Sequence, residues 1–351
     1  MPKLLAKINL KAIGDNARAF KTLTNTRLCA VVKADGYGHG AERVVYSLAH
    51  IADFFAVSSV EEALSIQAAA CGTPILVLTP PVKREEAETL VLEEFRCCIA
   101  DTNTLNLILS AAKKYKKRAF VHLKVNTGMN RYGMGLSELN SVCKTLATKE
   151  SVCVEGLFSH LYTHDQKTSE KQRLLFEEMR AVCKAQFPSV LCHLSSTYGA
   201  LLGKDYAYDM VRVGLGLYGY LPQAKLKNPP PLQKALSLWA SVVQSREYSG
   251  GGLGYGTPKK SGVTKARKKG VFVIQSGYGD GLNRAGGVER FDEQISRALC
   301  MDACILAGKK KAGEKIPVLT DAAAVAKRCK TIPYEILCSL SKRAEREYGY
   351  E

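Results

Sequence analysis

Short apolar runs recur along the first two thirds of the chain, and segments with apolar residues at helical spacing lie between them. Eight of these runs have the length and composition of buried strands. The predicted strands are residues 29–33, 54–59, 74–79, 96–100, 119–125, 154–160, 190–195 and 210–214. The predicted helices between them include residues 61–70, 85–95, 102–115 and 167–187.

Alternating strands and helices indicate a parallel sheet. Eight such units over about 200 residues fit a closed (β/α)8 TIM-type barrel better than an open doubly wound sheet. In such a barrel the chemistry lies where the strands end, at their carboxyl ends. The polar residues at these predicted ends, which we expect to converge on one mouth, are Lys33, Lys124, His160, Ser195, Ser196 and Arg212.

The pattern changes after residue 220. Pro222 and the run Pro229–Pro231 predict a linker, and an alternating strand follows at residues 236–243. Further β-type runs at residues 270–274, 295–299 and 315–319, with one helix near 321–330, predict a second, mainly-β domain. We therefore expect a barrel domain over residues 1–222 and a mainly-β domain over 232–351. For a first strand at residues 4–9, the C-terminal domain is an alternative pairing partner to the barrel.

Composition supports a soluble globular protein: 46% of the 351 residues are hydrophobic and 24% are charged. No apolar run approaches the ~20 residues that span a bilayer. The stretch 1–7 is basic but has no apolar segment behind it, which argues against a secretory signal and for a cytoplasmic location. The 12 cysteines are spread through apolar runs, where reduced core cysteines are expected.

The formal net charge of +17 raises the question of nucleic acid. However, the basic clusters at 113–118, 267–269, 309–311 and 342–343 are scattered, and no nucleic-acid-binding motif accompanies them. A solvated basic surface is favoured, with no nucleic-acid or membrane partner, although a positive field attracts small anions. His160 and His164 are four apart without a zinc motif, so no metal is predicted.

The stretch VVKADGYGHG, residues 31–40, places Lys33 at the end of a predicted strand. A lone lysine there is most simply a solvated strand end, but at a barrel mouth it can clamp phosphate, act as a base or form an imine. Gly214-Leu215-Gly216 follows the eighth strand, where barrels bind phosphate through backbone N–H groups. A phosphate site beside a buried lysine indicates pyridoxal 5'-phosphate held as a Schiff base.

At this point the sequence resembles the alanine racemase family of barrel-type pyridoxal-phosphate enzymes. The resemblance follows the family's order through nearly the whole chain. It rests on AVVKADGYGHG (30–40), KVNTGMNR (124–131), EGLFSH (155–160), MVRVG (210–214), GYG (254–256), GYGDG (277–281), CMD (300–302) and TIPYE (331–335).

The resemblance implies racemisation of L-alanine and D-alanine by two bases, which supplies D-alanine for cell-wall peptidoglycan. Lys33 holds the cofactor and is one base. Tyr255 is the other and comes from the partner subunit of a homodimer with shared active sites. By the same resemblance, the remaining roles are phosphate binding by Tyr37, Ser196, Tyr334 and the backbone of Gly214 and Leu215; further cofactor binding by His160 and Arg212; substrate carboxylate binding by Arg131 and the backbone of Met301; and support by Lys124, Tyr278 and Asp302.

Arg212 carries the most diagnostic expectation. A guanidinium facing the pyridine nitrogen keeps that nitrogen unprotonated, because arginine retains its proton at neutral pH. The ring is then a weaker electron sink, which disfavours transamination, whereas related decarboxylases place a carboxylate there. Lys124 is commonly carbamylated in the family and orients Arg131; an ordinary paired lysine is the alternative.

Two departures from the family concern Asn126, where Asp is usual, and Arg297, which stands one residue earlier than the family's arginine. A one-residue shift on a strand turns a side chain to the opposite face, so substrate entry is affected. Three alternatives remain at this stage: a racemase for serine or another amino acid, a noncatalytic pyridoxal-phosphate-binding protein, and a nucleic-acid-binding protein.

Overall fold

The computed structural model describes residues 4–224, 226, 228–255, 268–289, 299–340 and 343–350. The chain forms two compact units. One comprises Ile13–Gly36 and Ala41–Gln233, and the other comprises Met1–Ala12, Tyr37–Gly40 and Lys234–Glu351. The second unit therefore takes in the first strand and a short piece of the loop after Lys33.

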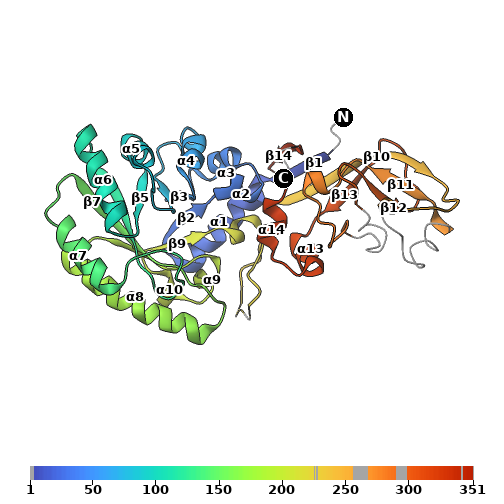
Figure 1. Ribbon diagram of the computed structural model, residues 1–351. Helices are drawn as coiled ribbons and strands as arrows, with labels where there is room; N and C mark the ends of the chain where they lie inside the picture. Colours follow the sequence, from blue (N-terminus) through green and yellow to red (C-terminus); the bar gives the residue numbers. More distant parts are fainter. Residues whose placement is uncertain are drawn as a thin grey trace. The chain divides into compact units, whose positions relative to one another are not determined.

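The first unit is built on eight parallel strands, with helices around their outer side (Figure 1). In spatial order the strands are β8 (Leu191–His193), β7 (Val152–Phe158), β6 (Ala119–Lys124), β5 (Arg96–Ile99), β4 (Ile75–Val77), β3 (Phe54–Val57), β2 (Arg27–Val31) and β9 (Met210–Val213). Between the outermost strands, the N–H of Arg212 donates to the carbonyl of Ser195 at 2.9 Å and that of Asp209 to Cys192 at 3.0 Å. The sheet is thus a nearly closed barrel, and the predicted barrel fold is confirmed.

The helices of this unit follow the predicted alternation. They are α1 (Leu10–Thr24), α3 (Ala41–Leu48), α4 (Val60–Ile66), α5 (Arg84–Leu92), α6 (Thr102–Tyr115), α7 (Leu136–Leu146), α8 (Gln166–Gln186), α9 (Thr197–Ala200), α10 (Lys204–Ala207) and the 3-10 turn η1 (Leu215–Tyr218). Asp101 and Asp165 cap α6 and α8 by accepting from the N–H of Thr104 and Thr168. These caps fix where the two helices begin.

All eight barrel strands end one or two residues earlier than predicted. β2 ends at Val31, β7 at Phe158 and β8 at His193, so Lys33, His160 and Ser195 lie two residues beyond their strands. After β2 the last ladder bond runs from the N–H of Val32 to the carbonyl of Ala56. Lys33, His160 and Ser195 therefore stand on loops just after their strands, whereas Lys124 and Arg212 lie within β6 and β9.

The second unit is mainly β. Its sheet has the order β12 (Cys304–Ala307), β11 (Val271–Ile274), β10 (Leu236–Arg246), β1 (Leu4–Asn9) and β14 (Glu345–Gly349), with β13 (Lys315–Leu319) also paired to β10. β1 runs antiparallel to β10 and parallel to β14. The described helical segments are η2 (Tyr278–Asp280), α13 (Ala322–Cys329) and α14 (Pro333–Cys338). Of the predicted strand 295–299, residues 295–298 lie outside the described residues.

The cysteines are free thiols, and seven of the twelve are buried. Burial raises the pKa of both Cys29 and Cys98 to about 12, so these thiols stay protonated and pack as small apolar side chains. Among the described residues, no helix is both long and apolar enough to cross a membrane.

Candidate functional site

The loop after β2 begins with a left-handed turn, which explains its composition. Ala34, Asp35 and Gly36 have φ values of 52°, 53° and 62°, a region that favours glycine and tolerates aspartate. The turn, labelled α2 (Lys33–Tyr37), is held by two carboxylates: Glu62 accepts from the N–H of Ala34 at 2.7 Å, and Asp35 accepts from Ala41 at 2.9 Å. It presents Lys33 half-buried rather than buried, which corrects the expectation of a buried lysine.

Arg212, on β9, is buried and donates on several sides. Its Nη1 donates to the carbonyl of His193 at 2.7 Å, and its Nη2 donates to the carbonyls of Ser159 at 2.6 Å and Leu194 at 3.1 Å. Nη2 also lies 3.2 Å from Nδ1 of His160. Burial lowers the pKa of Arg212 to about 10, which leaves the guanidinium charged at neutral pH. The backbone thus fixes a cation in one orientation.

His160 lies among cations. Burial lowers its pKa well below the usual value, and the charges of Arg212, Lys124, Arg131 and Lys33 lower it further. The structure therefore brings together five of the predicted site residues from the ends of β2, β6, β7 and β9 and the loop after β6. His160 is neutral at neutral pH, and the site as a whole is positive.

Lys124, at the end of β6, is the buried lysine of the barrel, with 4% of its surface exposed. Its Nζ lies 4.8 Å from the ring centroid of Phe158, and Arg212 lies 5.4 Å from the same ring. Burial and the charge of Arg212 lower the pKa of Lys124 to about 7. The ion pairs of the described residues include none to Lys124, and its carbamylation and an ordinary pairing both stay predictions.

The loop that carries Arg131 is shaped by Asn126. Its Oδ1 accepts from the N–H of Gly128 at 3.0 Å and of Asn130 at 3.1 Å, and its Nδ2 donates to Oδ1 of Asn130 at 2.9 Å. The amide therefore makes the turn-type bonds of an aspartate and adds one that a carboxylate cannot donate. These three bonds order residues 126–130, directly before Arg131.

Gln172 of α8 clamps the backbone of two of these loops. Its Nε2 donates to Oγ1 of Thr127 and to the carbonyl of His160, both at 3.1 Å, and its Oε1 accepts from the N–H of Tyr162. Thr127 in turn bonds the hydroxyl of Ser159 at 2.8 Å. Gln172 is not among the predicted site residues, because nothing in the helical pattern of the sequence marks one buried glutamine as bonded to loops.

The remaining barrel candidates stand at two short helical turns. Ser196 precedes α9 and Gly214 precedes η1, whose first residue, Leu215, is buried. The N–H of Gly216 donates to Oγ1 of Thr197 at 3.1 Å and joins the two turns. N–H groups at the start of a helical turn have no partner within the turn, which makes them suited to an anion.

Six of the predicted site residues lie in described parts of the second unit. The rings of Tyr37 and Tyr334 are 5.7 Å apart. Near η2, the N–H of Gly279 donates to the carbonyl of Met301 at 2.9 Å, and Asp302 pairs with Arg343. The other two, Tyr255 and Tyr278, are exposed. Arg297 lies outside the described residues.

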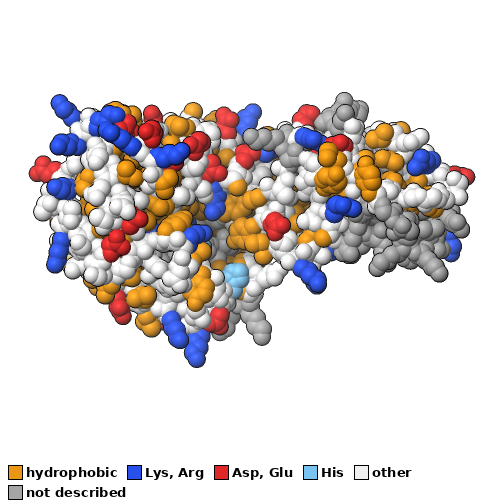
Figure 2. Space-filling model, in the orientation of Figure 1, with side chains coloured by type: hydrophobic (Ala, Val, Ile, Leu, Met, Phe, Trp, Pro, Cys, Tyr) orange, Lys and Arg blue, Asp and Glu red, His pale blue; other side chains and the backbone are white. Residues whose placement is uncertain are grey.

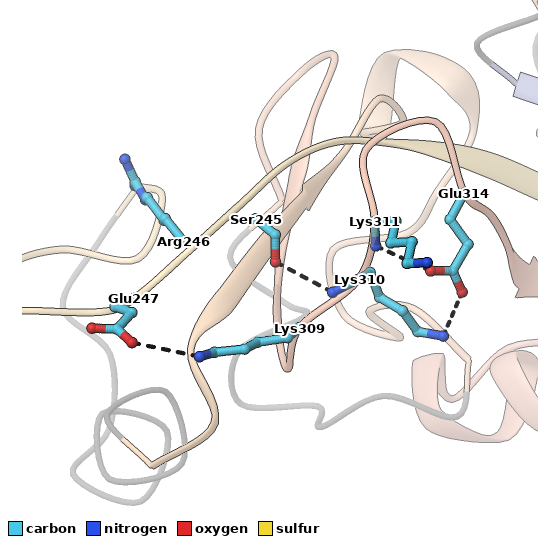
Figure 3. Close-up of a pocket in the computed structure, with 7 residues that line it drawn as sticks. All are labelled: Ser245, Arg246, Glu247, Lys309, Lys310, Lys311 and Glu314. Carbon is cyan, nitrogen blue, oxygen red and sulfur yellow. Dashed lines mark hydrogen bonds and ion pairs between the residues drawn. The ribbon is translucent and has the colours of Figure 1, made fainter.

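The described charged side chains away from the barrel mouth do not indicate a second site. On the face shown in Figure 2, Lys and Arg side chains are interspersed with Asp and Glu. A surface cavity of about 590 Å³ in the second unit is lined by Ser245, Arg246, Glu247, Lys309, Lys310, Lys311 and Glu314 (Figure 3). Its two carboxylates pair with Lys309 and Lys310. It contains none of the predicted site residues. No cluster of metal-binding side chains occurs in the part of the chain that the structure describes.

A (β/α)8 barrel with buried cations at the carboxyl ends of its strands, followed by a mainly-β unit, defines the class of barrel-type amino-acid racemases, which are isomerases. Residues 8–222 match the model of the alanine racemase N-terminal domain, and residues 235–348 match that of its C-terminal domain. The chain therefore belongs to the alanine racemase family, and the resemblance drawn from the motifs is confirmed.

Individual relatives match this protein over nearly its whole length. The alanine racemase of Francisella philomiragia is 30% identical over 98% of this chain and 99% of its own, and that of Symbiobacterium thermophilum is 32% identical over 99% and 97%. Among solved structures, alanine racemase from Bartonella henselae, with covalently bound pyridoxal phosphate, is 26% identical with a TM-score of 0.83 and covers 99% of both chains. The biosynthetic enzyme from Pseudomonas aeruginosa is 25% identical, with a TM-score of 0.84 over 99% of this chain and 100% of its own.

Proposed function

We propose that this protein interconverts L-alanine and D-alanine with pyridoxal 5'-phosphate and two bases, Lys33 and Tyr255. The observation that carries the proposal is the positive site around His160, to which Arg212, Lys124, Arg131 and Lys33 all contribute charge. The relatives in the family support alanine as the substrate. By the same reasoning the product D-alanine serves cell-wall peptidoglycan, and the active unit is a homodimer.

The residues present fit this cofactor. An excess of positive charge suits its phosphate and the substrate carboxylate. Arg212 is held by three carbonyls and keeps its charge, so it can only donate to a pyridine nitrogen. The residues we assign to the cofactor are Lys33, Tyr37, His160, Ser196, Arg212, Gly214, Leu215 and Tyr334. Tyr278 and Asp302 support the site.

When bound, pyridoxal phosphate stabilises the electron pair left on Cα after a proton departs. The chain supplies the proton transfers: Lys33 serves the enantiomer whose proton faces it, and Tyr255 of the partner subunit serves the other. Arg131 and the backbone of Met301 bind the substrate carboxylate. The charge of Arg212 keeps the pyridine nitrogen unprotonated, which confines the electron pair near Cα and favours return of the proton there.

Lys124 is suited to carbamylation. With its pKa lowered to about 7, much of the amine is uncharged at neutral pH and reacts with carbon dioxide. The product is an anion, which neutralises part of the positive site and gives Arg131 a partner. This change would hold Arg131 in place for the substrate carboxylate.

The experiment is direct. Purified protein is loaded with pyridoxal phosphate and incubated with single L-amino acids, and D-product is measured by chiral chromatography. D-Alanine as the main product is expected. A higher rate with serine or another amino acid would make that amino acid the preferred substrate. Absence of D-product from every amino acid would refute the proposed racemase activity.

A further inference from the structure

The interior of the barrel contains an unbroken line of polar side chains that begins at Arg212 and leads away from the mouth. Nδ1 of His193 lies 2.9 Å from Nη1 of Arg212, and Nε2 of His193 lies 2.8 Å from Nδ1 of His122. Nε2 of His122 lies 3.1 Å from Oε2 of Glu155. Arg96 then donates to both oxygens of Glu155, at 3.0 and 3.3 Å. These side chains come from β9, β8, β6, β7 and β5.

The two ends of this line determine where its protons lie. A guanidinium only donates, so Nδ1 of His193 accepts and its proton is on Nε2. That N–H donates to Nδ1 of His122, so the proton of His122 is on Nε2 and is donated to Glu155. An ionised carboxylate only accepts, which agrees with this direction. Both histidines are therefore neutral and share the same tautomer.

The electrostatics of the line agree with this assignment. Burial lowers the pKa of His122, and it lowers that of His193 well below the usual value. For Glu155, burial raises the pKa, but hydrogen bonds from His122 and Arg96 outweigh burial and lower it to about 2. The carboxylate is thus ionised, and both imidazoles are uncharged, at any pH near neutral.

A β-bulge builds the far end of the line. Val121 pairs with Val154 but His122 pairs with Gly156, so Glu155 is an additional residue in β7. Gly156 faces the imidazole of His122, and a Cβ there would lie 2.6 Å from its Cγ. The bulge and the glycine together allow Glu155 and His193 to contact the same histidine.

We propose that Glu155 is a positioning residue for Arg212: by accepting from His122 it fixes both histidine tautomers, and so presents a lone pair to Nη1 of Arg212. This inference rests on the proposed function only for the role of Arg212. The line itself is a property of the chain without cofactor. If Glu155 lost its charge, the line could reverse and bring an N–H of His193 against the N–H of Arg212.

The substitution Glu155→Gln should produce this reversal and lead to one defined pair of tautomers. The amide has one acceptor, and the charged Arg96 takes it, so the amide NH2 faces His122. His122 then accepts at Nε2 and carries its proton on Nδ1, and His193 is driven to the Nδ1–H form. Glu88→Gln is the matched control, because Glu88 also pairs with two cations, Arg84 and Lys114, but lies on α5 outside the line.

Nitrogen-15 NMR of the histidine rings reads the tautomers directly in protein without cofactor, and the chain has only six histidines to assign. We expect Nε2–H for His122 and His193 in the parent and in Glu88→Gln, and Nδ1–H for both in Glu155→Gln. A protonated or Nδ1–H His193 in the parent would overturn the proposal, as would unchanged tautomers in Glu155→Gln. Should Glu155→Gln not fold, the parent spectrum still decides the direction of the line.

Kinetics of the loaded enzyme give the second measurement. Mutating a residue that holds a functional side chain in place commonly lowers activity by about 10-fold or more, as it does for the outer partners of metal ligands. We therefore expect kcat of Glu155→Gln to fall by about that factor while KM changes little. Gly156→Ala, which breaks the His122 contact without changing any charge, should lower kcat similarly. Full kcat in both variants would contradict positioning of Arg212. If the parent shows no racemisation, the proposed function fails, while the tautomers still test the line.

Discussion

Arg212 donates from Nη2 to Nδ1 of His160, at 3.2 Å, and this contact sets the tautomer of the histidine. Because the guanidinium has no acceptor and burial keeps His160 neutral, the proton of His160 lies on Nε2. A charged side chain thereby orients a neutral one at the barrel mouth. Three carbonyls also hold the same guanidinium, so the backbone fixes its orientation.

Arg212→Glu tests whether this cation controls the reaction. A carboxylate stabilises a pyridine nitrogen that has taken up a proton from solvent, so we expect racemisation of alanine to slow by about 10²-fold or more and the proportion of transamination to rise. D-Alanine and pyruvate, measured in the same incubation, give the ratio. Arg27→Glu, the same change at an exposed arginine of β2, is the control and should leave it unchanged. An unchanged ratio in Arg212→Glu would count against the role of the guanidinium.

Lys33→Ala tests the covalent attachment. Loss of the amine should abolish both racemisation and the visible absorption of bound cofactor. In the parent, borohydride reduction followed by peptide mass spectrometry should place the cofactor on Lys33. Modification of the other lysine of the barrel mouth, Lys124, would refute the assignment.

The fold was predictable because it is a local property of the sequence. Apolar runs predict the strands of the barrel, and apolar residues at helical spacing predict its helices. α6, for example, matches the predicted residues 102–115. By contrast, β14 is a charged, half-exposed edge strand that pairs only with β1, so no apolar alternation marked it. β12 was not predicted either.

The site was predictable to a lesser extent. Its motifs identified the residues at the barrel mouth, but the line behind Arg212 was missed. His122 and His193 stand inside apolar runs, as isolated core histidines often do, and their contact depends on the strand register. A bulge at Glu155 sets that register, and a bulge leaves no signature in a single sequence.

Lys124 should make stability depend on pH. Burial, with the charge of Arg212, lowers its pKa to about 7 in the folded protein, so above that pH the unfolded chain binds a proton that the folded chain does not. The free energy of unfolding should therefore rise between about pH 7 and about pH 10, by up to about 1.4 kcal/mol per pH unit from this group. Lys124→Met should lack that contribution. Urea titrations in bicarbonate-free buffer measure it, and equal pH slopes for the two proteins would contradict it.

Gln172→Leu tests the clamp between α8 and the loops. The substitution leaves the carbonyl of His160 and the N–H of Tyr162, both in part-buried hydrogen bonds, without their partner, and an unpaired group shielded from water costs about 1–3 kcal/mol. We expect a loss of that order in the free energy of unfolding, with a weaker affinity for alanine. Gln186→Leu, at the exposed end of the same helix, should cost far less. Equal losses for the two variants would show that the hydrogen bonds of Gln172 add no stability beyond that of an ordinary exposed residue of α8.

Tyr255→Phe separates a two-base racemase from a one-base racemase. Bases on opposite faces of Cα each serve one enantiomer, so loss of the hydroxyl should slow proton removal from L-alanine by about 10²–10⁴-fold. Exchange of the Cα proton with deuterated solvent should persist for D-alanine, the enantiomer that we assign to Lys33. Tyr350→Phe, at another exposed tyrosine of the second unit and outside the proposed site, is the control for a general effect of losing a hydroxyl. Equal losses for both enantiomers would mean that Tyr255 is not the opposing base.

The same variant tests whether Tyr255 acts across a dimer interface. A Lys33→Ala chain lacks one base and a Tyr255→Phe chain lacks the other, so each homodimer has two defective sites. If each site takes Lys33 from one chain and Tyr255 from the other, a mixed dimer has one intact site and one that lacks both bases. Mixing the inactive proteins under conditions of subunit exchange should therefore restore up to half the parent activity per dimer, in proportion to the heterodimer seen by native mass spectrometry. Demonstrated heterodimers without activity would place Tyr255 in its own subunit's site, because each site would then still lack one base.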